Sequence, residues 1–166
     1  MVRKALMLVV PCLLVTLSFA QNSPTNQSAA PGPSGLPDKR LMQQIMDAWA
    51  TMDPAAAAKY YDQSPHDTFF DDAGGVKFVG WKAYEDGIRK VLTSEQSTKW
   101  TVNDDAVVHP AGNYAWGTAT VHTEYVFKNG SRQVMDERWT LIWIKKGGNW
   151  LVVHEHFSAP PADTPQ

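Results

Sequence analysis

The chain has 166 residues, with 15 Lys and Arg against 17 Asp and Glu, and a formal net charge of −2. This length suits one small domain with a single hydrophobic core. The sequence has no basic run and no basic helix face, which points away from a nucleic-acid partner. The single cysteine, Cys12, excludes an internal disulfide and a cysteine-based metal site.

The first twenty residues have the pattern of a secretory signal peptide. Arg3 and Lys4 precede a mostly apolar stretch, and Ser18-Phe19-Ala20 offers small residues before a cleavage site. The stretch is shorter than the ~20 residues of a membrane span. We therefore expect export to the periplasm or the medium, with no membrane contact after cleavage. The predicted organisation is a signal peptide at 1–20, a disordered Pro- and Ser-rich leader at 21–36, a folded domain at 37–160 and a disordered tail at 161–166.

The spacing of apolar residues predicts helices first and strands afterwards. Asp53-Pro54 favours a helix start, because Asp caps a helix and Pro suits its first position. Asn129-Gly130 is a strong hairpin signal. Helices followed by an antiparallel meander indicate an α+β fold. The predicted helices are 37–51, 55–61 and 81–92, and the predicted strands are 67–71, 76–79, 98–108, 114–127, 135–144 and 150–158.

The turn at Asn129-Gly130 decides which side chains share a face, since directly opposed residues lie on the same side of a sheet. A two-residue turn predicts one face, the tryptophan face, that carries Trp139, Leu141 and Trp143. The predicted pairs are Trp116 with Trp143, Thr118 with Leu141, Thr120 with Trp139 and His122 with Glu137. A three-residue loop with a glycine bulge at 147–148 adds Val153, Glu155 and Phe157, whereas a two-residue loop would turn the last strand over.

Three ionisable residues are predicted on this mostly apolar face: His122, Glu137 and Glu155. A carboxylate and an imidazole in a hydrophobic pocket suit proton transfer. The alternative for His122 and Glu137 is a solvated cross-strand pair near the end of the sheet.

The opposite face is predicted to carry Arg138 and the pair His154-x-His156. A metal site would need a third ligand, but no nearby Asp or Glu is placed to complete it, and Arg138 would repel a cation. We therefore expect no metal here, and polar partners in a packed interface instead.

The last strands carry a motif that identifies a family. In 143–160, Trp-x-x-x-Gly-Gly-x-Trp is followed by Val-His-Glu-His-Phe-Ser-Ala-Pro. With this ending, and with its order of elements from about Leu41 to Ser158, the chain resembles the nuclear transport factor 2-like superfamily, in particular its SnoaL-like branch. It is also similar to the calcium/calmodulin-dependent kinase association domain, whose ending is Trp-x-x-Val-His-x-His-x-Ser-Gly-Ala-Pro.

The resemblance implies a cone-shaped, curved antiparallel sheet that wraps around N-terminal helices and leaves an internal pocket (a cystatin-like roll). Members of the superfamily commonly dimerise through the outer face of the sheet, which implies a homodimer with Arg138, His154 and His156 on the dimer face. The pocket arginines of the kinase association domain correspond to Thr118, Leu141 and Phe157. The pocket is therefore expected to be apolar there and unsuited to a small carboxylate ligand.

The superfamily also contains steroid isomerases, limonene-epoxide hydrolases and polyketide cyclases. Asp71 lies at about the position of the general base of the isomerases, and an Asp in an apolar cleft can act as a base for enolisation. A turn before Gly74-Gly75 is the alternative role for Asp71. The isomerase oxyanion donors would fall at Ile45 and at Thr140 or Leu141, where neither donor is present, which counts against steroid isomerase activity.

We therefore expect an exported SnoaL-like domain that binds a small, largely apolar molecule and needs no cofactor. Two functions remain open: acid–base chemistry of the isomerase, cyclase or lyase type, and a non-catalytic ligand-binding or dimeric assembly module. The candidate catalytic residues are Asp71, Glu155, His122 and Glu137. The candidate ligand-binding residues are Trp49, Tyr60, Phe69, Trp81, Trp100, Trp116, Thr118, Trp139, Leu141 and Phe157; for Trp49 and Trp81, core packing is the favoured alternative.

Overall fold

The computed structural model describes residues 35–72 and 75–160. The predicted signal peptide, nearly all of the leader and the tail lie outside the described residues. In the described part of the chain, no helix is long and apolar enough to cross a membrane.

Three helices precede the long strands, as predicted. They are α1 (Lys39–Trp49), α2 (Pro54–Ala57), which continues into the 3₁₀ turn η1 (Ala58–Tyr60), and α3 (Trp81–Leu92). Asp38 caps α1 by accepting a hydrogen bond from the backbone N–H of Leu41, and Asp53 caps α2 ahead of Pro54. The start of α2 is therefore where the Asp-Pro pair places it.

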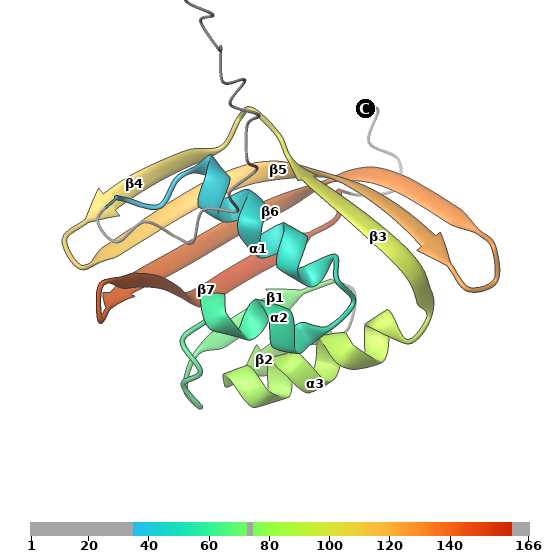
Figure 1. The fold of residues 1–166 in the computed structure, drawn as a ribbon, viewed down its shortest axis with the longest axis horizontal. Coiled ribbons are helices and arrows are strands. Elements are labelled where there is room, and N and C mark those ends of the chain that lie inside the picture. Colours follow the sequence, from blue (N-terminus) through green and yellow to red (C-terminus); the bar gives the residue numbers. More distant parts are fainter. Residues whose placement is uncertain (1–34, 73–74, 161–166) are drawn as a thin grey trace, which may run out of the picture. The chain divides into compact units, whose positions relative to one another are not determined.

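Within residues 35–72 and 75–160, seven strands form one curved, unclosed sheet, and the α+β class is confirmed. The strands are β1 (Thr68–Asp71), β2 (Gly75–Val79), β3 (Glu95–Val102), β4 (Val107–Ala111), β5 (Tyr114–Phe127), β6 (Arg132–Lys146) and β7 (Asn149–Ser158). Their order is β2-β1-β7-β6-β5-β3, and β4 also pairs with β5. The sheet departs from the prediction in two ways. β1 runs parallel to β7, and the predicted strand 98–108 is interrupted at 103–106, so that β3 and β4 are separate strands. Figure 1 shows α1 crossing the long strands, and α3 lies beside β2.

The predicted register between β5 and β6 is wrong by one residue. The loop has three residues, 128–130: Phe127 N–H donates to the carbonyl of Ser131 (2.9 Å), and Gly130 has φ +84°. Leu141 therefore pairs with Gly117, not Thr118. The shift turns every side chain of β5 to the other face.

Packing explains why β5 takes this register. The β5 residues opposite Trp139, Leu141 and Trp143 are Ala119, Gly117 and Ala115. These small residues leave room for the two indoles: a Cβ on Gly117 would lie 2.9 Å from the Trp143 ring. Trp139 and Trp143 are fully buried as a result.

The register between β6 and β7 differs from the prediction in two features, the loop length and a bulge, and their effects cancel. The loop has two residues, Gly147 and Gly148, both with positive φ, and so is shorter than predicted. A bulge between Ile142 and Trp143 in the pairing then shifts the register back. Glu155 pairs with Leu141 and Phe157 with Trp139, so both lie on the tryptophan face as predicted. Before the bulge, the buried residue is Val152, not Val153.

Aromatic residues fill the space between the helices and the short strands. Trp49, Tyr61, Phe69, Trp81 and Tyr84 contact one another, and the rings of Phe69 and Tyr84 stack with centroids 4.7 Å apart. This cluster fixes the position of α3 against β1.

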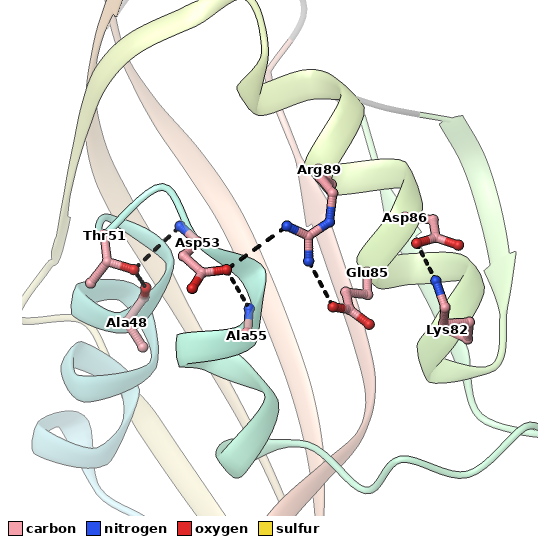
Figure 2. A network of polar contacts seen from close by, with 8 residues as sticks. All are labelled: Ala48, Thr51, Asp53, Ala55, Lys82, Glu85, Asp86 and Arg89. Atoms are coloured by element: carbon pink, nitrogen blue, oxygen red, sulfur yellow. Dashed lines mark hydrogen bonds and ion pairs between the residues drawn. The ribbon is translucent and has the colours of Figure 1, made fainter.

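Exposed ion pairs add to the docking of α2 and α3. Figure 2 shows Arg89 of α3 reaching Glu85 on its own helix and Asp53, the cap of α2. Such exposed pairs stabilise little individually, but this one joins the two helices on their solvent side.

Candidate functional site

A cavity of about 50 Å³ lies between α1, α3 and the sheet. Its wall is mainly apolar and aromatic, and every charged residue in it is acidic. The lining residues are Met46, Trp49, Asp71, Asp72, Tyr84, Ile88, Val91, Leu92, Glu95, Trp100, Tyr125, Glu155 and Phe157. The wall therefore favours an uncharged, largely apolar molecule over an anion.

The cavity adjoins a groove on the molecular surface. Asp71, Asp72 and Phe157 line both the cavity and this groove, which also contains Phe70 and His156. These shared residues connect the interior to solvent.

Glu155 on β7 is the most enclosed carboxyl group in the wall, with 2% of its surface exposed. The hydroxyl of Tyr61 lies 3.0 Å from both of its oxygens, and Trp139 Nε1 donates to Oε2 at 3.0 Å. Trp49 Nε1 in turn donates to the Tyr61 hydroxyl (2.9 Å). Burial raises the pKa of Glu155 to about 7, although these hydrogen bonds favour its charged form. Glu155 can therefore gain or lose a proton near neutral pH.

Asp71 and Glu155 are linked through a tyrosine. Tyr84 of α3 donates from its hydroxyl to Asp71 Oδ2 (3.3 Å), and the same hydroxyl lies near enough to Glu155 to favour the charged form of that carboxyl group. The negative charge of Asp71 helps to raise the pKa of Glu155. Burial, then the charges of Glu155 and Asp71, raise the pKa of Tyr84 well above its usual value, so this hydroxyl keeps its proton. The three groups form a carboxyl–hydroxyl–carboxyl arrangement in the wall.

A second buried carboxyl group, Glu137 on β6, lies behind the wall and is 2% exposed. Thr123 donates from Oγ1 to Glu137 Oε2 at 2.5 Å, and the Tyr125 hydroxyl lies 3.2 and 3.4 Å from the two carboxyl oxygens. Burial raises the pKa of Glu137 to about 7, and the charges of Asp72 and Asp71 act in the same direction. Glu137 reaches the cavity through Tyr125, which lines it.

The four candidate catalytic residues lie in three different places relative to the cavity. Asp71 and Glu155 lie in the cavity wall, and Glu137 lies behind it. His122 points to the opposite face, where its Nδ1 lies 2.9 Å from Asp136 Oδ1. The predicted contact between His122 and Glu137, whether as a proton-transfer pair or a solvated pair, is therefore wrong, because the register shift separates them by the thickness of the sheet.

The candidate ligand-binding residues fall into four groups, the last of which is the outward-facing pair Trp116 and Thr118. Trp49, Trp100 and Phe157 line the cavity. Buried core residues outside the lining are Phe69, Trp81, Trp139 and Leu141. Tyr60, half-buried at the end of η1, does not line the cavity.

Trp116 and Thr118 do not share the tryptophan face, and the prediction that they do is wrong. Both alternate with Gly117, so the shifted register turns them outward. Trp116 is 45% exposed and stacks on His109, with ring centroids 4.1 Å apart.

Sequence reasoning missed Tyr84, Tyr125, Asp72 and Glu95 as wall residues. Tyr84 had a signal, because it lies on the predicted apolar face of the third helix. Tyr125 was hidden by the register error, which assigned it to the opposite face.

The outer face carries Arg138, His154 and His156, as the register of β6 with β7 requires. Arg138 donates to the carbonyl of Ala159 (3.0 Å), and His154 Nδ1 lies 2.7 Å from the carbonyl oxygen of Thr68. Across residues 35–72 and 75–160, no group of three or more His, Cys, Asp or Glu is arranged to hold a metal ion.

Comparisons with known proteins give one matching family model and many similar structures. The model of the SnoaL-like domain matches residues 39–163. No curated protein matches the sequence.

Three similar solved structures illustrate the fold. A nuclear transport factor 2-like superfamily protein from Salmonella enterica serovar Typhimurium has a TM-score of 0.65 and 19% identity, covering 76% of this chain and 93% of that one. The association domain of C. elegans CaMKII has a TM-score of 0.57 and 24% identity, covering 72% and 91%. A protein from Novosphingobium aromaticivorans, proposed to be a scytalone dehydratase, has a TM-score of 0.64 and 12% identity, covering 77% and 92%. At these identities the likeness shows the nuclear transport factor 2-like fold.

Proposed function

Because the chain belongs to the SnoaL-like domain family of the nuclear transport factor 2-like superfamily, we propose that its cavity binds a small, largely apolar carbonyl compound and moves a proton on it. The observation that carries this proposal is the Asp71–Tyr84–Glu155 arrangement in an aromatic wall. A carboxylate and two hydroxyl donors in one enclosed place are the groups that enolisation needs.

Each residue has a distinct role in the proposed reaction. Asp71, as a carboxylate, takes a proton from the carbon next to the carbonyl group. The electron pair of that C–H bond forms the C=C bond of the enolate, while the π pair of the carbonyl group moves to its oxygen. This oxygen accepts hydrogen bonds from Tyr84 and from protonated Glu155. Asp71 then returns the proton to carbon, at the same or another position, which completes an exchange or an isomerisation.

The donors expected from the isomerases are absent at Ile45 and at Thr140 or Leu141, and Ile45 is fully buried. Tyr84 from α3 and Glu155 from β7 offer hydroxyl donors from other elements. This supports an acid–base function without the isomerase arrangement.

Exchange of α-protons for deuterium in D₂O tests the proposal even when the product of the reaction is unidentified. A panel of small cyclic ketones, followed by NMR, measures proton removal from carbon, and binding is measured on the same panel. We expect Asp71→Asn to reduce exchange by roughly 10²–10⁴-fold with binding retained. Asp136→Asn, on the outer face, is the matched control. Binding without exchange by the wild-type protein would reject catalysis and leave the binding module.

The alternative function, a dimeric assembly module, is supported by the outer face of the sheet. Val107, Tyr114 and Trp116 are 45–49% exposed on β4 and β5, and large exposed apolar residues often mark interaction surfaces. The CaMKII association domain shares the fold. On this basis we propose a homodimer through the outer face that includes Arg138, His154 and His156. Light scattering should give a dimer that Trp116→Lys weakens; a wild-type monomer at micromolar concentration would reject it.

We also propose export with cleavage after Ala20, on the basis of the basic, apolar and small-residue pattern of the first twenty residues. The mass of the protein recovered from the periplasm or medium should correspond to a chain that begins at Gln21. A full-length chain retained in the cell would reject export.

A further inference from the structure

Three tyrosines near the cavity differ in how firmly their hydroxyl groups are held. Tyr61 lies 3.0 Å from both oxygens of Glu155 and accepts a 2.9 Å hydrogen bond from Trp49. Tyr84 donates to Asp71 at 3.3 Å. Tyr125 has contacts of 3.2 and 3.4 Å to Glu137; contacts of this length are long for a hydroxyl donor. Tyr84 and Tyr125 both line the cavity, and since the proposed function already assigns Tyr84 to the carbonyl oxygen, Tyr125 is the hydroxyl left for a second group of the ligand.

Tyr125 can turn toward a ligand without leaving Glu137 unsatisfied. The short bond from Thr123 to Glu137, 2.5 Å, remains when Tyr125 moves. A comparable movement of Tyr61 would remove the acceptor of the Trp49 N–H group in the core, which is unfavourable. The hydrogen bonds thus make Tyr125 adjustable and Tyr61 fixed.

Trp100 on β3 adds an unused donor at the same place. Its ring lies perpendicular to that of Tyr125, with centroids 6.2 Å apart. Its buried N–H approaches the Tyr125 hydroxyl but meets no acceptor at hydrogen-bond geometry among the described residues. Buried donors are usually satisfied, so this pair has more hydrogen-bonding capacity than the protein itself uses.

We propose that Tyr125 and Trp100 form a second recognition point of the cavity, which binds an uncharged oxygen of the ligand, such as a hydroxyl group. This inference rests on the proposed function and narrows its substrate class to small carbonyl compounds with a second oxygen. An anionic group is disfavoured, because buried Glu95, which also lines the cavity, and Glu137 lie close by.

The two recognition points lie on opposite sides of β6 in the sheet. Asp71 and Glu155 are on β1 and β7, whereas Tyr125 and Trp100 are on β5 and β3 (Figure 1). A ligand that contacts both points therefore has to extend across β6 within the cavity.

Two ketones of similar size test the inference: 4-hydroxycyclohexanone and 4-methylcyclohexanone. Their dissociation constants are measured by NMR titration of the protein. We expect the wild-type protein to bind the hydroxy ketone about fivefold more tightly, the effect of one net hydrogen bond. Tyr125→Phe should bring this ratio to about one with binding of the methyl ketone unchanged. Tyr114→Phe, on the outer face of the same strand, is the matched control and should keep the ratio.

The outcomes separate the inference from the proposed function. Equal binding of the two ketones by the wild-type protein, or an unchanged ratio in Tyr125→Phe, would overturn the inference alone. No binding of either ketone would overturn the proposed function and the inference with it. Should Tyr125→Phe fail to fold, Trp100→Phe should also lower the ratio. Trp143→Phe removes another buried, unpartnered indole N–H away from the cavity lining and should not.

Discussion

Glu155 and Glu137 resemble each other in burial and acidity but differ in their surroundings. Each is 2% exposed, and burial raises the pKa of each to about 7. Glu155 lies in the cavity wall beside Asp71, while Glu137 lies behind Tyr125. The comparison shows that burial sets the proton affinity of both groups, and that position and hydrogen bonds decide whether each can act on a ligand directly.

The two glutamates also have parallel sets of partners. The Trp49 N–H donates to the Tyr61 hydroxyl at 2.9 Å, and this hydroxyl lies 3.0 Å from Glu155. Trp100, Tyr125 and Glu137 follow the same order, but the Tyr125 hydroxyl has longer contacts to Glu137 and the Trp100 N–H has no acceptor among the described residues. The first set is a fixed support for a proton-transfer group, and the second is open to a ligand.

The largest expected effect is on the pH dependence of stability. Each glutamate has a folded pKa of about 7 against an ordinary value of 4.5, so the folded protein binds more protons. The stabilisation is complete below pH 4.5 and is lost as the pH rises to 7 and above, by about 3 kcal/mol for each group. Urea unfolding from pH 4.5 to 8 should show this decline.

Glu155→Gln and Glu137→Gln should each flatten that decline, since an amide does not titrate. Glu124→Gln, an exposed residue of β5, serves as the control and should leave the decline in place. A free energy of unfolding that rises over this range in the wild-type protein, or no flattening in either variant, would contradict the pKa assignments.

Replacing each glutamate by leucine should lower the free energy of unfolding by a different amount, and this effect is smaller than the dependence on pH. Glu155→Leu removes the acceptor of Tyr61 and of the Trp139 N–H, and we expect a loss of about 2–4 kcal/mol at pH 6. Glu137→Leu should cost about half as much, because only the Thr123 hydroxyl loses a short hydrogen bond while Tyr125 can turn toward the cavity. Chemical denaturation measures both; an equal or reversed order would show that the two sites are held alike.

The smallest expected difference in stability is between the variants Tyr61→Phe and Tyr125→Phe. Tyr61→Phe should destabilise the fold by about 1–2 kcal/mol, because it breaks a bond to Glu155 and strands the Trp49 N–H. Tyr125→Phe should cost about 0.5 kcal/mol or less, because only long contacts are lost. Thermal or urea unfolding of the two variants side by side makes the comparison. A larger loss for Tyr125→Phe would mean that its hydroxyl is firmly held.

The sequence was sufficient for most of the elements and for the residues that β6 buries, but not for the break between β3 and β4 or for the face of β5. Asn129-Gly130 suits a two-residue turn and also the end of a three-residue loop with Gly130 in the left-handed region. One residue of difference reverses every side chain of β5. The alternation of Ala115, Gly117 and Ala119 was the available signal, because only small residues fit beside Trp139 and Trp143.

For β7 the correct face followed from two errors that cancelled. The bulge near Trp143 offset the effect of the shorter glycine turn on the register. No sequence pattern predicted this bulge. Asp71 and Glu155 could be proposed from the family resemblance and the face pattern. Their link through Tyr84 could not, because it depends on how α3 packs across β1.

Titration of the glutamate side chains measures directly whether burial raises the pKa of Glu155 and of Glu137. With ¹³C-labelled glutamate, NMR follows each side-chain carboxyl carbon from pH 3 to 9, and the Gln variants assign the signals. We expect Glu155 and Glu137 to titrate near pH 7, and Asp71→Asn to lower the pKa of Glu155 by removing a neighbouring negative charge. Titration of both glutamates at their ordinary value near 4.5 would contradict this expectation.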